Sequence, residues 1–339
     1  MGSVLKSYTA ASRFPLVDIA GRKIPRIILG QHPYDGTTYT SWTRDQAYRR
    51  RWTGPHRMVE LMKPIVHRFG VAASREVPTD TALSHWHQDA LTRTMDDLNQ
   101  EIALVLGTAL PTTPQKDTSE HLYRLSYALA GDAFAAIWRV DPIIRYRFLE
   151  RLRQRQVDID AFARHAMDTP LTVPPGLREF EVDYAALDAL LDRYRDFTVP
   201  LFASNAAFEL LVLTQRFDEL QRIVDAIRRR FGGFLLGTHY AGVIIPLVED
   251  AGVRVDGYLT PVNAAGIYMF PTQTHAVDAI RRAGKPVIAI KPLGGGRVPP
   301  TKAFHYLFHD LDLPAAMVGI GSLAEAEETL GAATTVLAC

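Results

Sequence analysis

Eight short apolar runs, most of them followed by a helical pattern, are spaced along the chain. They cover residues 24–29, 69–73, 102–106, 198–203, 233–236, 255–259, 286–290 and 316–320. Runs such as PVIAI and FLL are apolar throughout, which is typical of parallel strands covered on both faces. Because strands alternate with helices, the pattern predicts an α/β fold, a (β/α)8 TIM barrel formed by residues 1–339 as one domain.

The stretch between the third and fourth predicted strands is much longer than one crossover requires. Within residues 111–197, the segments 121–138, 141–154 and 182–197 carry apolar residues at steps of three and four, which predicts helices. We expect an inserted helical subdomain here, acting either as a lid over the barrel mouth or as the surface of a homodimer. A further amphipathic helix is predicted over residues 208–230.

Composition narrows the class of protein. The chain has 38 basic and 37 acidic residues, a net charge of +1, and 47% hydrophobic residues. We therefore expect a globular protein that binds neither nucleic acid nor a membrane. The N-terminus lacks a signal-peptide pattern, so a cytoplasmic location is expected. Cys339 is the single cysteine, which excludes an intrachain disulfide and a cysteine-rich metal site.

Four segments of the C-terminal half lie in the order and spacing of the last four strands of a known family. They read FLLGTHYAGVIIPLVEDAG, VDGYLTPVN, KPVIAIKPLGGGRV and AAMVGIGSLAEAEETLGAA, and the opening KIPRIILGQHPYDG matches the family's first strand. With these segments the chain resembles the aldo/keto reductase superfamily. The resemblance implies a TIM barrel and makes NADP a possible cofactor, although the residues do not predict a cofactor firmly.

The chain departs from this superfamily at the residues that carry its redox chemistry. The superfamily uses an aspartate, a tyrosine, a lysine and a histidine. By strand order, the segments that correspond to the aspartate, the lysine and the histidine read GVAASRE, LVLGTA and PLFASN here, and none contains the expected residue. GTHY stands where a serine–asparagine pair is common, VDGYLTPVN lacks the glutamine, and Ile290 replaces the tyrosine that stacks on nicotinamide. These departures favour a divergent member without ordinary hydride transfer.

In a barrel, residues at the carboxyl ends of the strands form the active site. Lys291 follows an apolar strand, so three roles are open for it: Schiff-base formation, general-base or electrostatic work, and structural pairing. His32 and His239 follow the first and fifth strands and are candidate acids or bases. With Glu76 after the second strand they form a loose two-histidine, one-carboxylate set, although a firm metal site is not predicted.

Two more candidates lie in the loop GQHPYDGTTYTSW. Tyr34 is a candidate replacement for the missing catalytic tyrosine, as is Tyr240 after the fifth strand. Asp35 is a candidate acid, but Asp35 with Gly36 is also explained by turn formation.

Anion binding is predicted at the glycine-rich ends of the last two strands. Gly294, Gly295 and Gly296 permit close backbone approach, and Arg297 offers a bidentate donor. Gly321 and Ser322 precede a helix N-terminus, which adds positive potential. Asn263 at the end of the sixth strand completes the predicted anion-binding set.

Three functions follow as alternatives. The main interpretation is a small-molecule enzyme that performs non-redox acid-base chemistry, as a lyase, isomerase or cyclase, on an anionic substrate. The second is an NAD(P)-dependent oxidoreductase with a relocated proton donor. The third is a non-catalytic binding subunit that acts through the helical insertion.

Overall fold

The computed structural model describes residues 8–116, 156, 158, 161, 175–205 and 207–338. Eight of its strands pair in parallel and close into a barrel in the order β10-β11-β12-β3-β4-β5-β8-β9. In chain order they are β3 (Ile27–Gly30), β4 (Ala73–Glu76), β5 (Ala103–Leu106), β8 (Leu201–Ala203), β9 (Gly233–Gly237), β10 (Gly257–Pro261), β11 (Val287–Ile290) and β12 (Ala315–Gly319). The predicted (β/α)8 barrel is therefore confirmed.

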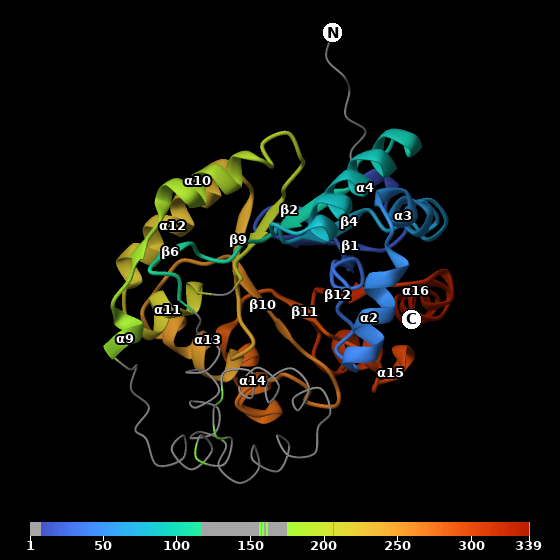
Figure 1. Cartoon of the computed structure of the whole chain (residues 1–339). Coiled ribbons are helices and arrows are strands. Elements are labelled where there is room, and N and C mark those ends of the chain that lie inside the picture. Colours follow the sequence, from blue (N-terminus) through green and yellow to red (C-terminus); the bar gives the residue numbers. More distant parts are fainter. Residues whose placement is uncertain are drawn as a thin grey trace.

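Helices surround the strands, as Figure 1 shows. On one side of the barrel lie α9, α10 and α12, and on the other lie α3, α4 and α16. The helices are α1 (Tyr8–Ala11), α2 (Trp42–Arg51), α3 (Pro55–Phe69), α4 (Ala82–Leu98), α9 (Pro175–Arg178), α10 (Tyr184–Asp192), α11 (Phe208–Leu213), α12 (Phe217–Arg230), α13 (Ala241–Asp250), α14 (Gln273–Ala283), α15 (Pro300–His305), the π-helical turn η2 (Tyr306–Asp310) and α16 (Leu323–Leu337).

Two apolar layers hold the barrel together. Inside it, alternate strand residues such as Ile28, Val105 and Ile288 form one buried cluster, because successive side chains of a strand point to opposite faces. The same cluster includes Ile19 and Ile24 from the antiparallel hairpin of β1 (Leu16–Ile19) and β2 (Arg22–Pro25). The outward-facing strand residues pack against the helices in the larger second cluster. The hairpin thus contributes side chains to the barrel interior. It leaves the carboxyl ends of the strands available to form a cavity.

Two of the differences between the predicted and the observed element boundaries affect the placement of site residues or helices. Phe69 ends α3, Gly70 caps it at a φ of +68°, and β4 begins only at Ala73. This shift places Arg75 and Glu76 inside a strand, where they point to opposite faces. The predicted helix 208–230 is interrupted because Gln215 adopts a φ of +59°, which separates α11 from α12.

The long stretch between β5 and β8 is described only at its ends. A two-stranded sheet pairs β6 (Thr112–Thr113) with β7 (Glu181–Val182), and α10 forms within the predicted helix 182–197. The predicted helices 121–138 and 141–154 lie outside the described residues. A lid or dimer role for the insertion stays a prediction.

No helix within the described ranges is both long and apolar enough to cross a membrane.

Candidate functional site

A cavity of about 950 Å³ opens where the carboxyl ends of the barrel strands meet. Its lining joins residues from the loops after β3, β4, β8, β9 and β11. Of the predicted candidates it includes His32, Asp35, His239, Tyr240, Lys291, Gly295, Gly296 and Arg297. The structure therefore brings together candidates that are up to 265 residues apart, between His32 and Arg297.

Lys291 and His239 are in direct contact in this cavity. The Lys291 Nζ atom lies 2.7 Å from Nε2 of His239. Burial, the charge of Lys291 and the charge of His32 lower the pKa of His239 well below its ordinary value. His239 is therefore neutral at neutral pH, and its Nε2 accepts a hydrogen bond from the Lys291 ammonium group.

A second pair of contacts links three residues of the loop after β3. The Nδ1 atom of His32 lies 2.9 Å from Oδ2 of Asp35, and its Nε2 atom lies 2.5 Å from the hydroxyl oxygen of Tyr39. The carboxylate of Asp35 favours the tautomer with a proton on Nδ1, so Nε2 can accept the hydrogen bond of the phenol. Asp35, His32 and Tyr39 form a relay along which the phenol can give up its proton.

Aromatic rings connect the relay with the lysine. The Nζ atom of Lys291 lies 4.5 Å from the centroid of the Tyr39 ring and 5.4 Å from that of Tyr268. The two tyrosine rings are in edge contact at 5.6 Å. A cation held against two aromatic faces is attracted by their quadrupoles. Lys291 therefore connects His239 with the relay of Asp35, His32 and Tyr39.

The backbone is strained at this meeting point. Lys291, Tyr39 and Tyr268 have φ angles of +54°, +58° and +60°, in the left-handed region that residues with a Cβ rarely adopt. Each such conformation costs about 1–3 kcal/mol, and residues of this kind cluster at active sites and ligand clamps. Three strained residues from three separate segments meet in one contact cluster, which makes this cluster the candidate functional site.

Glu209 is a buried carboxyl group of the lining that sequence analysis missed. It lies in α11, after β8, and accepts a hydrogen bond of 2.6 Å from the Thr238 hydroxyl. Burial raises the pKa of Glu209 to about 7, although the bonds from Thr238 and the His239 backbone act in the opposite direction. An acidic residue within an otherwise apolar helical segment, FELLVL, is the signal that would have identified it.

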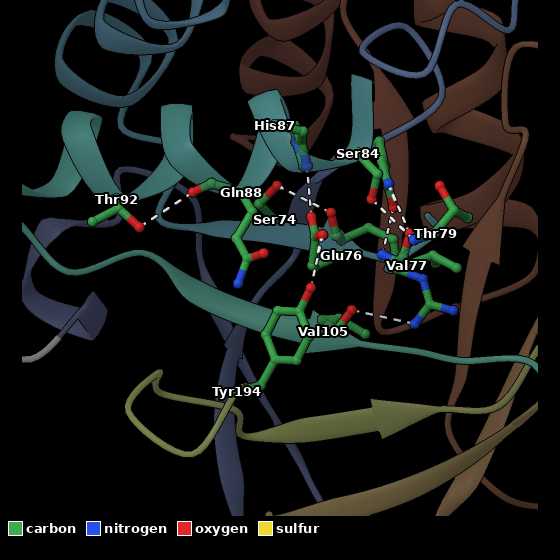
Figure 2. A network of polar contacts seen from close by, with 12 residues as sticks. Ser74, Glu76, Val77, Thr79, Ser84, His87, Gln88, Thr92, Val105 and Tyr194 are labelled. Atoms are coloured by element: carbon green, nitrogen blue, oxygen red, sulfur yellow. Dashed lines mark hydrogen bonds and ion pairs between the residues drawn. The ribbon is translucent and has the colours of Figure 1, made fainter. Parts of the chain in front are cut away.

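Glu76 lies outside the mouth. Its carboxylate is fully buried and contacts Nδ1 of His87 at 2.5 Å and the hydroxyl of Tyr194 at 3.1 Å, on the side of β4 that faces α4 (Figure 2). The expected set of His32, His239 and Glu76 is therefore not formed. Within the part of the chain that the structure describes, no other group of three such side chains is arranged to hold a metal ion.

Tyr34 is also turned away from the cavity. It is completely buried, stacks on Trp52 with ring centroids 5.5 Å apart, and contacts His87 at 4.9 Å. Burial, with a smaller contribution from the charge of Glu325, strongly raises its pKa. Tyr34 is a core residue beside the Glu76 network, and Tyr39, five positions later, is the tyrosine that reaches the site.

The predicted anion-binding residues divide into two groups. Gly295, Gly296 and Arg297 line the cavity, but Arg297 donates weakly to the carbonyl oxygens of Gly294 and Gly295 at 3.3 and 3.4 Å. Gly294 is buried beneath the loop. The Asn263 side chain is also buried and bonds the backbone of Ile267, so it shapes the loop after β10 instead of facing a ligand.

The N-terminus of α16 is closed by a carboxylate of the chain itself. Glu325 accepts hydrogen bonds from the backbone N–H of Gly321 at 2.7 Å and from the Tyr48 hydroxyl at 2.5 Å. Ser322 caps the helix by accepting from the Glu325 N–H. Because Glu325 takes the position that an anion would occupy, Gly321 and Ser322 are not offered to a ligand.

This arrangement does not fit a cofactor phosphate at α16. Glu325 and Glu328 both line the cavity there, and two carboxylates repel a phosphate group. The N–H of Gly321 that would receive it is already bonded. The residues at the α16 N-terminus therefore do not fit the phosphate of NADP.

The chain is similar to several solved structures that are described as aldo-keto reductases. One from Pseudomonas aeruginosa has 12% identity, covers 95% of each chain and has a TM-score of 0.49. One from Bombyx mori, in complex with NADP, has 10% identity, covers 96% of this chain and 92% of its own, and has a TM-score of 0.45. A thermostable one, in complex with the inhibitor epalrestat, has 14% identity, covers 94% of each chain and has a TM-score of 0.47.

At these identities and TM-scores the likeness carries no argument about function. The assignment of the fold as a barrel is based on the closed order of the strands. No protein-family model matches the chain. No curated protein matches it either.

Proposed function

We propose that the barrel mouth is the active site of an enzyme that removes and returns a proton at the carbon beside a carbonyl group of a small molecule. This chemistry belongs to isomerases and lyases. The observation that supports it is the contact cluster of Tyr39, Lys291 and Tyr268, whose backbones are strained. On one side of this cluster the Asp35–His32 pair contacts the Tyr39 hydroxyl. On the other side His239 contacts Lys291.

Tyr39 is the proposed base. Its phenol proton passes to Nε2 of His32, and the imidazolium that forms is stabilised by the carboxylate of Asp35. The phenolate oxygen then takes the proton from the substrate carbon. The Lys291 ammonium group lies 4.5 Å from the centroid of the Tyr39 ring, where its positive charge is close to the negative charge that forms on the phenolate.

Lys291 is the proposed electrophile. When the C–H bond breaks, its electron pair moves to the carbonyl oxygen, which becomes an enolate. An N–H of Lys291 donates to this oxygen, and the neutral His239 orients the ammonium group by accepting another N–H. Return of the proton from Tyr39 to the same or a neighbouring carbon leaves Tyr39 as the phenolate. The proton held on Nε2 of His32 then passes back to Tyr39, which regenerates the enzyme.

Deuterium exchange tests this proposal without knowledge of the natural substrate. The protein is incubated in D₂O with a panel of 2-oxo acids and ketones, and loss of the α-proton signal is followed by NMR. We expect at least one compound to exchange faster than it does without protein, and Lys291→Met to abolish the effect. If every compound exchanges at the protein-free rate, the proposal is wrong.

A nicotinamide-dependent oxidoreductase is the second candidate. It is favoured by the residue types of the mouth, since an aspartate, a tyrosine, a lysine and a histidine meet there. It is disfavoured by Glu325 and Glu328 at α16. Fluorescence titration with NADPH and NADH separates the candidates, because micromolar binding supports only the oxidoreductase.

A further inference from the structure

Arg75 is a buried cation at the cavity wall to which the proposed reaction assigns no role. It extends from β4 into the barrel, is 6% exposed and belongs to the cavity lining. One terminal nitrogen, Nη1, donates to the carbonyl oxygens of Val105 and Leu106 at 3.2 Å each. The other, Nη2, donates to the carbonyl oxygen of Ala203 at 3.0 Å. These acceptors lie at the carboxyl ends of β5 and β8.

The contacts leave one edge of the guanidinium group unused. A guanidinium group has five N–H donors, and the Nε–H together with one Nη2–H forms an edge that matches both oxygens of a carboxylate. Within the described ranges, the only acceptors of Arg75 are the three carbonyl oxygens. The Nε edge is therefore open to a ligand.

The positive charge also lacks an ion-pair partner among the described residues. Glu76 is adjacent in sequence, but it points to the other face of β4, where its carboxylate is bonded to His87 and Tyr194. Burial lowers the pKa of Arg75 to about 10, against the opposing effect of Glu76, so the group is still charged at neutral pH. A buried charge without a counter-ion is costly, and carbonyl dipoles offset only part of that cost.

Gly107 leaves the space that the Arg75 guanidinium group occupies. A Cβ atom added at Gly107 would meet Nη2 of Arg75 at 2.1 Å and the carbonyl oxygen of Ala203 at 2.5 Å. Gly107 follows β5 directly, so a residue with any side chain there would displace the guanidinium group. The three carbonyl oxygens and the missing side chain together form a built slot.

We infer that Arg75 binds a carboxylate group of the substrate through its Nε–Nη2 edge, which makes the substrate a small carbonyl-containing carboxylic acid. The inference rests on the proposed function for the reacting group and deepens it by adding the anchor. Lys291 directly follows β11 and Arg75 lies on β4, three strands away in the barrel, so the reacting and anchoring groups lie on different parts of the wall.

The other fixed cations of the lining are less suited to this role. Lys291 is engaged with His239 and two aromatic rings. Arg297 is half-buried and bonded to loop carbonyls, and Arg44 is exposed. Arg75 alone of these four combines deep burial with an open bidentate edge.

The test compares the binding of benzoate with that of benzamide, its uncharged counterpart, by calorimetry on the whole protein. We expect the wild type to prefer benzoate by about tenfold or more, as for a charge-assisted bidentate pair. Arg75→Lys keeps the charge but loses the planar edge, so the preference falls below about threefold. Arg297→Gln and Arg44→Gln are matched controls that retain it. A preference that persists in Arg75→Lys, or that is absent from the wild type, overturns the inference.

Should Arg75→Lys fail to fold, judged by circular dichroism, the other three cations decide the question. A benzoate preference that survives in Arg44→Gln, Lys291→Met and Arg297→Gln supports Arg75, and its loss in any of them assigns the anion site there instead. Because binding is measured without turnover, failure of the deuterium-exchange experiment and failure of this one are distinguishable.

Discussion

The Nζ atom of Lys291 lies 2.7 Å from Nε2 of His239, and the two residues come from neighbouring regions of the barrel mouth after β11 and β9. A lysine ammonium group bonded to an imidazole keeps the imidazole neutral, since a second positive charge at that distance is unfavourable. The pair therefore carries a single positive charge, which is located on Lys291. This charge is suited to stabilising negative charge on a substrate oxygen.

The first prediction concerns the titration of His239. Lys291→Met removes one of the two charges that depress its pKa, so we expect the pKa to rise, but to stay below its ordinary value because burial is the largest cause. NMR of the imidazole signals measures the change. The linked effect on stability has a definite sign. Protonation of the unfolded state below pH about 6.5 destabilises the wild type as pH falls, and the variant loses less stability in that range. An unchanged His239 pKa would contradict the pairing.

The second prediction concerns Glu209. Its pKa is raised from 4.5 to about 7, so the unfolded state ionises first as pH rises and the folded protein loses stability between these two values. Glu209→Gln cannot ionise. Its unfolding free energy relative to the wild type should therefore increase from pH 4.5 to pH 8, by about 3 kcal/mol at 1.36 kcal/mol per pH unit.

Urea unfolding at several pH values measures this difference. The exposed Glu179, which lies outside the cavity, provides the control variant Glu179→Gln. We expect the control to track the wild type at every pH. A Glu209→Gln curve parallel to the wild-type curve would show that Glu209 ionises normally.

The third prediction separates the two tyrosines that contact Lys291. Tyr39→Phe keeps the ring against the lysine but removes the hydroxyl that contacts His32, so proton exchange at carbon should fall by about 10²–10⁴-fold. Tyr268→Phe keeps its ring at the same lysine and should retain exchange within about tenfold. Initial rates in D₂O provide the measurement. Equal losses in both variants would remove Tyr39 from the role of base.

The fourth prediction concerns the buried network behind the barrel wall. Glu76→Gln removes the charge that pairs with His87 and weakens the contact with Tyr194, all of it away from water. We expect a loss of about 1.5–3 kcal/mol in the free energy of unfolding, as for weakened buried hydrogen bonds to a charged group. Glu60→Gln breaks an exposed pair with Arg57 and should cost less than about 1 kcal/mol.

Thermal and urea unfolding of both variants check this expectation. A small effect of Glu76→Gln, similar to that of Glu60→Gln, would show that the network does not stabilise the fold. Loss of exchange activity without loss of stability would return Glu76 to the candidate site.

The sequence by itself determined the barrel and, to within two residues, the carboxyl ends of all its strands except β4. Continuous apolar runs such as VIAI are buried on both faces of a parallel sheet, so their pattern is visible without knowledge of their partners. Residues directly after those runs, Lys291 and His239 above all, were predictable for the same reason. Local hydrogen bonding also made the helix start at Ser322 readable, because its cap lies within one turn.

Only the tertiary structure decided which side chains meet. A shift of β4 by a few residues turned Glu76 outward and Arg75 inward, because neighbouring positions of a strand face opposite sides. Tyr39 lies nine residues beyond β3, in a loop whose path no periodic pattern specifies. The carboxylate of Glu325, which closes the α16 N-terminus at Gly321, also accepts a hydrogen bond from Tyr48, 277 residues earlier in the chain. Contacts between such distant segments depend on how the barrel closes. The hydrophobic pattern along the chain does not specify which distant segments come into contact.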